Sequence, residues 1–229
     1  MAQALAANGW RVAVHYHRGQ ESADHVVESI LAAGGEALAV AADLSSQSEA
    51  AALFQRIEKS FGPLDCLVNN AGINRDVLLA FMTEEQWDEV IDTNLRATYV
   101  CSRLAVLEMM RHGGGSICNI ASPSGVRGQA GQCNYAASKG GIIAFTKSLA
   151  RETARYKITV NCVCPGPTDT PLFQGQPDKM KAALERAIPF RRIAQPQELA
   201  DAILFFASAR SDYVTAQVLS VSGGLTMVG

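Results

Sequence analysis

The sequence has few charges and no cluster of basic residues. Lys and Arg number 20 against 22 Asp and Glu, which gives a net charge of −2 over 229 residues. A nucleic-acid-binding surface needs a stripe of Lys and Arg to pair with phosphates, so no nucleic-acid partner is predicted. Polar residues interrupt the apolar stretches well before the roughly 18 positions that a membrane-spanning helix requires, so we expect no membrane partner.

The chain also lacks the usual signatures of secretion and of metal binding. Residues 1–10 read MAQALAANGW, without the basic stretch and apolar run of a secretory signal. Six cysteines are present, but their spacing forms neither a Cys-x-x-Cys pair nor a zinc pattern. We therefore expect reduced thiols, a cytoplasmic location and no metal site.

Short β-branched runs alternate with longer amphipathic segments along the whole chain. The predicted strands are residues 11–15, 37–41, 66–69, 116–121 and 159–164, and the predicted helices are 22–33, 47–61, 88–111 and 134–156. Strict alternation predicts an α/β fold with a doubly wound parallel sheet, in a single domain over residues 1–229. Thr83 and Gln86 form a capping-box pattern, and the glycines at 34–35 and 113–115 predict helix ends.

The beginning of the chain lacks the usual start of such a fold. A doubly wound fold opens with a strand, a glycine-rich turn and a helix. Here residues 1–7 read as the second half of a helix that Asn8-Gly9 closes, and the first 30 residues contain no G-x-G-x-x-G. We therefore expect the first strand and its loop to be missing, with Met1 an internal methionine of a longer protein.

Tyr135 and Lys139 carry the first chemical signal. In Tyr-Ala-Ala-Ser-Lys they are four positions apart, so on a helix they share a face. An ammonium beside a phenol lowers the pKa of the phenol, which lets Tyr135 exchange a proton with a substrate oxygen. Taken alone, such a pair is more often a solvated helix face. Ser122 follows the strand at 116–121, where its hydroxyl could stabilise an oxyanion or simply belong to a turn.

Other polar residues follow predicted strands or interrupt a helical pattern. Asn69-Asn70-Ala71-Gly72 ends one strand with residues that suit a flat ligand, and Asp43 after another could bind an adenine edge. Both are equally ordinary turn or N-cap residues. Asn94 is either a buried amide that needs partners or an exposed helical residue. Residues 165–170, PGPTDT, form a rigid turn after the strand at 159–164, and the turn alone is enough to explain them.

The ordered set of these motifs resembles the short-chain dehydrogenase/reductase family. The pieces are Asn-Asn-Ala-Gly, Asn94, Ser122, the Tyr-x-x-x-Lys of 135–139 and Pro165-Gly166, and the resemblance continues through residues 218–227. It implies that Tyr135 is the general acid and base. It further implies that Lys139 lowers the pKa of Tyr135 and holds the nicotinamide ribose, Ser122 polarises the substrate carbonyl, and Asn94 anchors a proton-relaying water.

The same resemblance implies which residues bind the cofactor. The adenosine side falls on Asn70, Ala71 and Gly72, the adenine on Asp43 and Leu44, the ribose on Tyr135 and Lys139, and the nicotinamide amide on Pro165, Gly166, Thr168 and Thr170. In the family the first strand lies in the middle of the sheet. Its absence would leave the strands on either side with unpaired backbone groups.

The end of the strand at 11–15 predicts which nicotinamide cofactor binds. NAD-dependent relatives carry an acidic residue there for the ribose hydroxyls. This chain reads His15-Tyr16-His17-Arg18 and has no carboxylate before Glu21. Arg18, with His17 beside it, can pair with a 2′-phosphate, although it could also be a solvated loop residue. We predict a preference for NADP(H) over NAD(H).

The choice of substrate rests on resemblance to branches of the family. VHYHRG, NNAGINRDVLL and YAASKGG resemble 3-oxoacyl-(acyl-carrier-protein) reductases, which implies a carrier-linked acyl thioester substrate, fatty acid biosynthesis and commonly a homotetramer. VCPGPTDT and LSVSGGLTM also resemble dehydrogenases of cyclic hydroxyacyl-CoA thioesters. A third alternative is a non-catalytic truncated subunit that associates with a complete relative.

Overall fold

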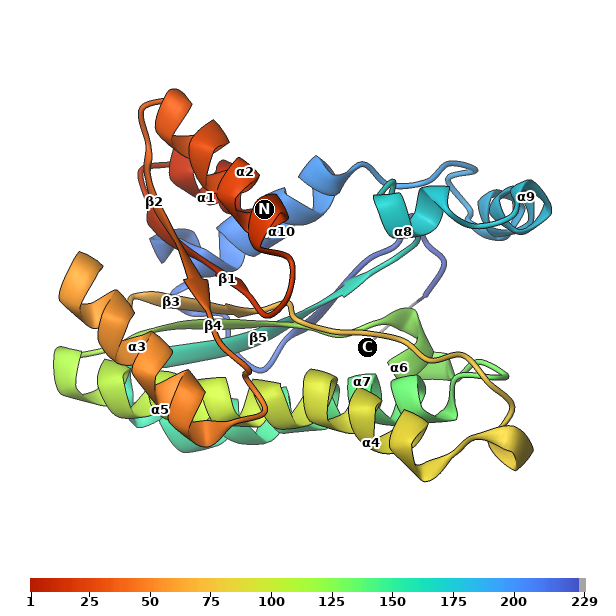
Figure 1. Cartoon of the computed structure of the whole chain (residues 1–229), viewed down its shortest axis with the longest axis horizontal. Coiled ribbons are helices and arrows are strands. Elements are labelled where there is room, and N and C mark those ends of the chain that lie inside the picture. The colour runs from red at the N-terminus through yellow and green to blue at the C-terminus, as the bar shows by residue number, and fades with distance from the viewer. Residues whose placement is uncertain (227–229) are drawn as a thin grey trace.

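Parallel strands form the centre of the protein, and helices cover them on both sides (Figure 1). The computed structural model describes residues 1–226, apart from the side chain of Leu172. The strands are β1 (Arg11–Tyr16), β2 (Glu36–Ala41), β3 (Cys66–Asn69), β4 (Gly115–Ile120), β5 (Ile158–Pro165) and β6 (Val218–Val221). The tail predicted from residues 218–227 thus begins as a strand, and Met227 lies outside the described residues.

Ten helices and four shorter turns of helix connect these strands within residues 1–226. The helices are α1 (Ala2–Ala7), α2 (Gln20–Ala32), α3 (Gln47–Phe61), α4 (Glu84–Ile91), α5 (Ala97–His112), α6 (Pro123–Arg127), α7 (Cys133–Thr153), α8 (Pro171–Gln174), α9 (Asp178–Ala187) and α10 (Pro196–Ala207). The shorter turns are η1 (Leu79–Phe81), η2 (Asp92–Arg96), η3 (Ala154–Tyr156) and η4 (Ala209–Ser211). None of the helices in this part of the chain has the length and apolar character that crossing a membrane requires.

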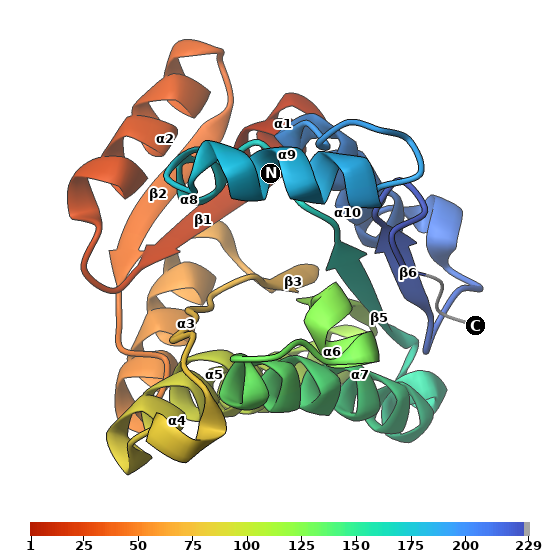
Figure 2. The same cartoon turned by 90° about the vertical axis from the view of Figure 1, so that its right-hand side faces the viewer.

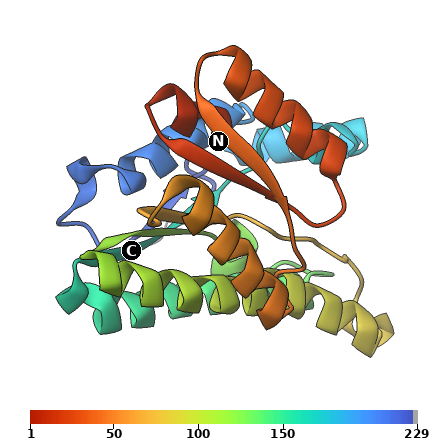
Figure 3. The ribbon, with the colours of Figure 1, turned by 60° about the vertical axis from the view of Figure 1, so that its left-hand side comes forward.

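Every strand pair is parallel, as the alternation of strands and helices predicts. β1 pairs with β2 in one sheet, and β3, β4, β5 and β6 follow one another in a second sheet (Figure 3). Within residues 1–226 no pairing joins β1 to β3. A cleft of about 1160 Å³ lies between these two strands and is lined by both.

Two apolar clusters hold the helices on opposite faces of the second sheet. On one face, Met109 of α5 and Phe54 of α3 pack against Ile117 of β4. On the other face, Ile203 and Phe206 of α10 pack against strand residues of β4 and β5. Figure 1 shows α3, α5 and α7 below the strands and α1, α2 and α10 above them. Burial on both faces explains why these strands read as continuous apolar runs.

Local sequence signals set most of the boundaries. β3 and α3 have the predicted bounds, β1 and β2 differ from prediction by one residue at one end, and β4 and β5 differ by one residue at each end. Thr83 and Gln86 form the predicted capping box, in which each backbone N–H donates to the other side chain at 3.1 and 3.3 Å. Gly34 and Gly113 end helices with positive φ angles of 81° and 95°, which glycine adopts without strain.

The single helix predicted over residues 88–111 is wrong. The structure divides this segment into α4, a π-helical turn η2 and α5. A π turn adds one residue to the helix, and such turns frequently occur at functional sites. The extra residue directs Asn94 inward, where the side chain is completely buried. The sequence analysis also did not predict α10, although Pro196 and the Gln195/Glu198 capping box mark its start.

A buried set of polar side chains joins β3 and β4 to the helices below them. Asn119 is completely buried; it accepts a hydrogen bond from Asn69 Nδ2 at 2.8 Å and donates one to Thr146 Oγ1 at 2.9 Å. Asn69 Nδ2 also donates to Ser102 Oγ at 3.0 Å. Thr146 Oγ1 in turn donates to the Ile142 carbonyl at 2.8 Å, so the members of this set support one another and removing one costs its partners a hydrogen bond each.

We expect Asn119→Ala to lower the free energy of unfolding by about 1–3 kcal/mol, since the buried Asn69 amide and the buried Thr146 hydroxyl each lose one of their hydrogen bonds. Urea denaturation followed by circular dichroism measures the change. Asn8→Ala is the control, because the exposed Asn8 amide donates only to the Ala4 carbonyl at the end of α1. That control should stay within about 0.5 kcal/mol of the parent. Equal stabilities for the two variants would contradict the role given to the buried set.

Candidate active site

The carboxyl ends of β3, β4 and β5 meet at one edge of the sheet and bring together residues from three distant parts of the chain. Asn70 to Gly72 follow β3, Ser122 follows β4, and Pro165-Gly166 ends β5. At this edge α8 and α9 lie on one side and α4 and α6 on the other (Figure 2). Open α/β sheets bind their ligands at such an edge, outside the carboxyl ends of the strands.

Ser122 is the N-cap residue of α6, and its hydroxyl faces Tyr135. The Ser124 N–H donates to Ser122 Oγ at 3.2 Å. Since that oxygen already accepts one hydrogen bond, the hydroxyl hydrogen remains available for donation. Burial raises the pKa of the Tyr135 phenol, and hydrogen bonding with Ser122 opposes that rise. Ser122 and Tyr135 are therefore brought together as the sequence predicts.

Lys139 lies one helical turn after Tyr135 and is buried, with a relative exposure of 4%. Its Nζ donates to the Ile120 carbonyl at 2.9 Å and lies 5.7 Å from the centre of the Tyr135 ring. Burial lowers the pKa of Lys139 to about 8. A Cβ atom at Gly72 would lie only 3.3 Å from this Nζ. The absence of a side chain at Gly72 therefore lets the strip after β3 pass directly beside the ammonium.

The predicted lowering of the Tyr135 pKa is wrong for this structure. Burial of the phenol is the largest influence on its pKa and raises it, and Lys139 is not among the groups that shift it. The physical reason is that both groups are buried together, so desolvation disfavours the phenolate and the ammonium alike.

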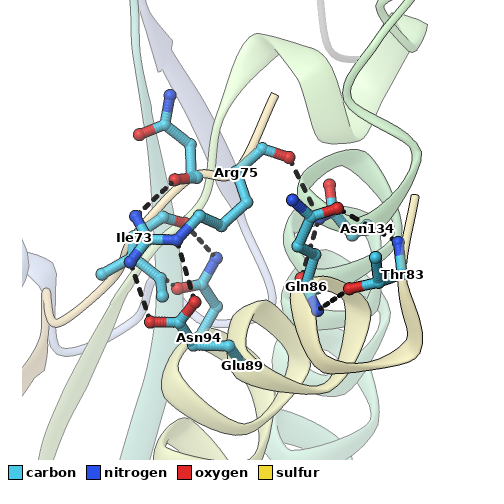
Figure 4. Close-up of polar contacts among 8 residues, drawn as sticks. Ile73, Arg75, Thr83, Gln86, Glu89, Asn94 and Asn134 are labelled. Carbon is cyan, nitrogen blue, oxygen red and sulfur yellow. Dashed lines mark hydrogen bonds and ion pairs between the residues drawn. The ribbon is translucent and has the colours of Figure 1, made fainter. Parts of the chain in front are cut away.

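Asn94 is buried and fully paired, which decides between the two alternatives left open by the sequence. Its Oδ1 accepts the Ile73 N–H at 2.8 Å, and Nδ2 donates to the Ile73 carbonyl at 3.0 Å (Figure 4). Nδ2 also donates to Ser138 Oγ at 3.0 Å. A Cβ at Gly72 would lie 3.2 Å from Asn94 Oδ1. Asn94 thus holds the strip of chain that leaves β3 against α7.

The cleft between β1 and β3 collects seven of the predicted cofactor-binding residues. They come from the segments after β1, β2 and β3, and are His17, Arg18, Asp43, Leu44, Asn70, Ala71 and Gly72. Arg18 contributes a positive charge to a wall that has no carboxylate between residues 11 and 18. The Asp43 carboxylate is occupied by Ser45, whose N–H and hydroxyl donate to it at 2.9 and 2.7 Å. These bonds hold the pKa of Asp43 below its usual value.

The predicted nicotinamide-binding residues after β5 do not line this cleft in the part of the chain that the structure describes. The Gly166 N–H donates to the Val221 carbonyl at 2.9 Å, and Thr168 Oγ1 donates to the Gly166 carbonyl at 2.8 Å. Thr170 is the N-cap residue of α8. Pro165, Gly166, Thr168 and Thr170 therefore form the turn that leads from the sheet edge into α8.

Three residues that the sequence analysis did not single out support the site. Ser138 Oγ accepts from Asn94 and donates to the Tyr135 carbonyl at 2.8 Å. The completely buried Asn134 accepts the Tyr135 N–H at 2.7 Å. Gln132 donates to Asp76 at 2.9 Å and accepts from Ser124 at 2.7 Å. All three lie within four residues of Tyr135 or Lys139, so proximity to the motif was the available signal.

Known proteins resemble this chain along almost its whole length. A family model described as enoyl-(acyl carrier protein) reductase matches residues 1–226. The chain is 41% identical over 227 residues to the 3-oxoacyl-[acyl-carrier-protein] reductase FabG of Staphylococcus aureus, an alignment that covers 99% of this chain and 92% of that protein.

Two further relatives extend the comparison. The chain is 40% identical to the 3-oxoacyl-[acyl-carrier-protein] reductase of a Synechocystis strain, over 99% of this chain and 91% of that protein. It is 46% identical to FabG of Chlamydia muridarum over 184 residues, which cover 80% of this chain and 74% of that protein. The fold, the geometry at the sheet edge and these matches together show that the chain belongs to the short-chain dehydrogenase/reductase family of NAD(P)-dependent oxidoreductases.

Proposed function

We propose that this protein reduces a 3-oxoacyl thioester, carried by an acyl carrier protein, to the 3-hydroxyacyl thioester with NADPH. The observation that carries the proposal is the meeting of Ser122, Tyr135 and Lys139, with Lys139 beside Gly72, which lines the cleft that also bears Arg18. The relatives named as 3-oxoacyl-[acyl-carrier-protein] reductases support the choice of substrate. A cytoplasmic homotetramer is part of the same proposal.

In this proposal Tyr135 is the general acid and donates its phenol proton to the substrate oxygen. A reduction requires the protonated phenol, and the raised pKa of Tyr135 keeps the phenol protonated at neutral pH. Ser122 donates its free hydroxyl hydrogen to the same oxygen and stabilises the negative charge that develops there. The nicotinamide, when bound, supplies the hydride to the carbonyl carbon.

Lys139 stays charged at neutral pH, because its pKa of about 8 lies above 7. We assign its charge to the ribose hydroxyls of the cofactor, beside the Tyr135 ring. Asn94 keeps Gly72 and Ile73 beside the Lys139 ammonium. The anchoring of a proton-relaying water by Asn94 remains a prediction. After proton donation to the substrate, the Tyr135 phenol would regain a proton from the part of the site where Lys139 lies.

The segments around the cleft divide the cofactor among them. We assign the 2′-phosphate to Arg18 and His17, the adenine to Asp43 and Leu44, and the adenosine side to residues 70–72. The turn with Pro165, Gly166, Thr168 and Thr170 is assigned to the nicotinamide amide. The usual partner of a pyrophosphate is a glycine-rich turn at a helix N-terminus. Residues 1–30 contain no G-x-G-x-x-G, so we assign no residue to the pyrophosphate.

Tyr135→Phe tests the assignment of the general acid. Loss of the proton donor should lower kcat about 10²- to 10⁴-fold, measured as NADPH oxidation at 340 nm with an acetoacetyl thioester. Tyr213→Phe, on a fully exposed ring, is the control and should retain the parent rate. A parent chain that turns over no thioester, or a Tyr135→Phe variant as fast as the parent, would sink the proposal. The former outcome would favour a non-catalytic subunit.

Arg18→Asp tests the preference for NADPH. A charge-assisted bond to the 2′-phosphate is replaced by repulsion, so the Kd for NADPH should rise roughly 10- to 100-fold while that for NADH changes little. Quenching of tryptophan fluorescence measures both constants. Arg210→Asp, in the exposed turn η4, is the charge-matched control. If Arg18→Asp keeps the parent's ratio of the two constants, Arg18 does not read the phosphate.

The burial of Lys139 predicts how stability depends on pH. Its pKa is 10.5 when exposed and about 8 in the folded chain, so the unfolded chain binds more protons between these values. The free energy of unfolding should therefore rise with pH across this window, by about 3 kcal/mol for this group. Lys139→Met should remove that rise in urea denaturation at pH 8 and 10.5. Lys147→Met, on an exposed lysine, should keep it, and identical slopes in both variants would contradict the burial argument.

A further inference from the structure

Two completely buried asparagines hold the same strip of chain from opposite ends. Asn94, in η2, binds both the N–H and the carbonyl of Ile73 at 2.8 and 3.0 Å. Asn134, in the first turn of α7, donates from Nδ2 to the Arg75 carbonyl at 3.2 Å. Figure 4 shows both amides pointing toward residues 73–75 from different helices. This strip continues directly from Gly72, which lies against Lys139.

Every hydrogen-bonding position of the Asn134 amide is used except one lone pair. Besides its bond to Arg75, Nδ2 donates to the Gln86 carbonyl of α4 at 3.1 Å, and Oδ1 accepts the Tyr135 N–H at 2.7 Å. Two donations and one acceptance fix the orientation of the amide. One side chain therefore joins α4, the strip at 73–75 and the first turn of α7.

The bond to Tyr135 has a particular consequence for the phenol. The first N–H groups of a helix have no partner inside the helix, and the N-cap residue Gln132 gives α7 no side-chain cap. Asn134 supplies the missing acceptor at Tyr135 itself. The backbone position of Tyr135 is thus tied, through one amide, to the strip that lines the cofactor cleft.

The side chain of Arg75 links this strip to α4, and that link is weaker. Arg75 forms a bidentate pair with Glu89 at 2.8 Å for both bonds, but each side chain is about half exposed. Exposed ion pairs contribute little to stability because water screens them. The buried amide of Asn134 is therefore a stronger restraint on Arg75 than this ion pair, and it joins the strip to α7 beside the link that Asn94 makes through Ser138.

We propose that Asn134 is a positioning residue for the reaction, which holds the Tyr135 phenol at a set distance from the cofactor-lining strip at residues 70–75. This inference rests on the proposed reductase function. Proton donation by Tyr135 and hydride delivery at the cleft must meet at one carbonyl group, so a small displacement between the two walls slows the reaction. A misplacement of about 1 Å can cost about 100-fold in rate.

Two substitutions and a matched control test this role. Asn134→Asp keeps the size of the side chain and the acceptor for Tyr135, but places carboxylate oxygens against two carbonyls; Asn134→Ala removes all three bonds. Asn161 is the matched control, because this buried amide also donates to a carbonyl, that of Val214 at 2.8 Å, and accepts an N–H, that of Gln217 at 3.0 Å. Asn161→Asp therefore reports the general cost of a buried carboxylate.

We expect both Asn134 variants to lower kcat about 10- to 100-fold, with KM values for NADPH and thioester within about threefold of the parent. Asn161→Asp should keep the parent kcat for the folded fraction, measured by near-ultraviolet circular dichroism. Equal kcat losses for Asn134→Asp and Asn161→Asp, or Asn134 variants within twofold of the parent, would overturn the inference.

A second readout does not need turnover and separates this inference from the proposed function. The ionisation of Tyr135 is obtained from the absorbance of phenolate at 295 nm, as the difference between each protein and its Tyr135→Phe partner. Burial raises the phenol pKa in the parent. Asn134→Ala should move that pKa toward 10, because loosening the first turn of α7 admits water. An inactive parent refutes the function alone, whereas an unchanged phenol pKa refutes the positioning role.

Discussion

Parallel pairing of β3, β4 and β5 is the constraint on which the site depends. Because the three strands run in one direction, the residues that follow them emerge at one edge of the sheet. Gly72, Ser122 and Gly166 are far apart in the sequence and become neighbours of that edge only through this register. The helix α7 packs on the same sheet and brings Tyr135 to it.

Burial then sets the charge states at the edge. Both the phenol of Tyr135 and the ammonium of Lys139 are buried away from water. Desolvation favours the neutral form of each group, so it raises the pKa of Tyr135 and lowers the pKa of Lys139. The Ile120 carbonyl accepts from Lys139, and Ser122 opposes the rise at Tyr135. Such a pair keeps a proton on the phenol and a charge on the amine at neutral pH. This combination suits an acid that must give a proton to a carbonyl oxygen.

Much of the fold and the site could be predicted because the relevant signals are local. The short apolar run at 66–69 and the capping pattern at Thr83 define their elements without distant partners. The ordered motifs likewise predicted that Ser122 and Tyr135 meet. The π-helical turn at Asn94 could not be predicted, because its cause is a pair of bonds to Ile73, 21 residues away. The bonds of Asn134 cross 59 and 48 residues, so only the folded chain reveals them.

The separation of β1 from β3 leaves a cleft between two sheets, with Arg18 on one wall and Gly72 on the other, and to this cleft we assign the cofactor. The account's central claim is that hydride crosses this cleft to a carbonyl held by Ser122 and Tyr135. Transfer of deuterium tests it most directly, with NADPH that carries deuterium in both hydrogen positions of nicotinamide C4 and an acetoacetyl thioester as reactants. The account predicts a 3-hydroxy product with deuterium bound to C3, observed by nuclear magnetic resonance. A product without deuterium, or no product at all, would contradict it.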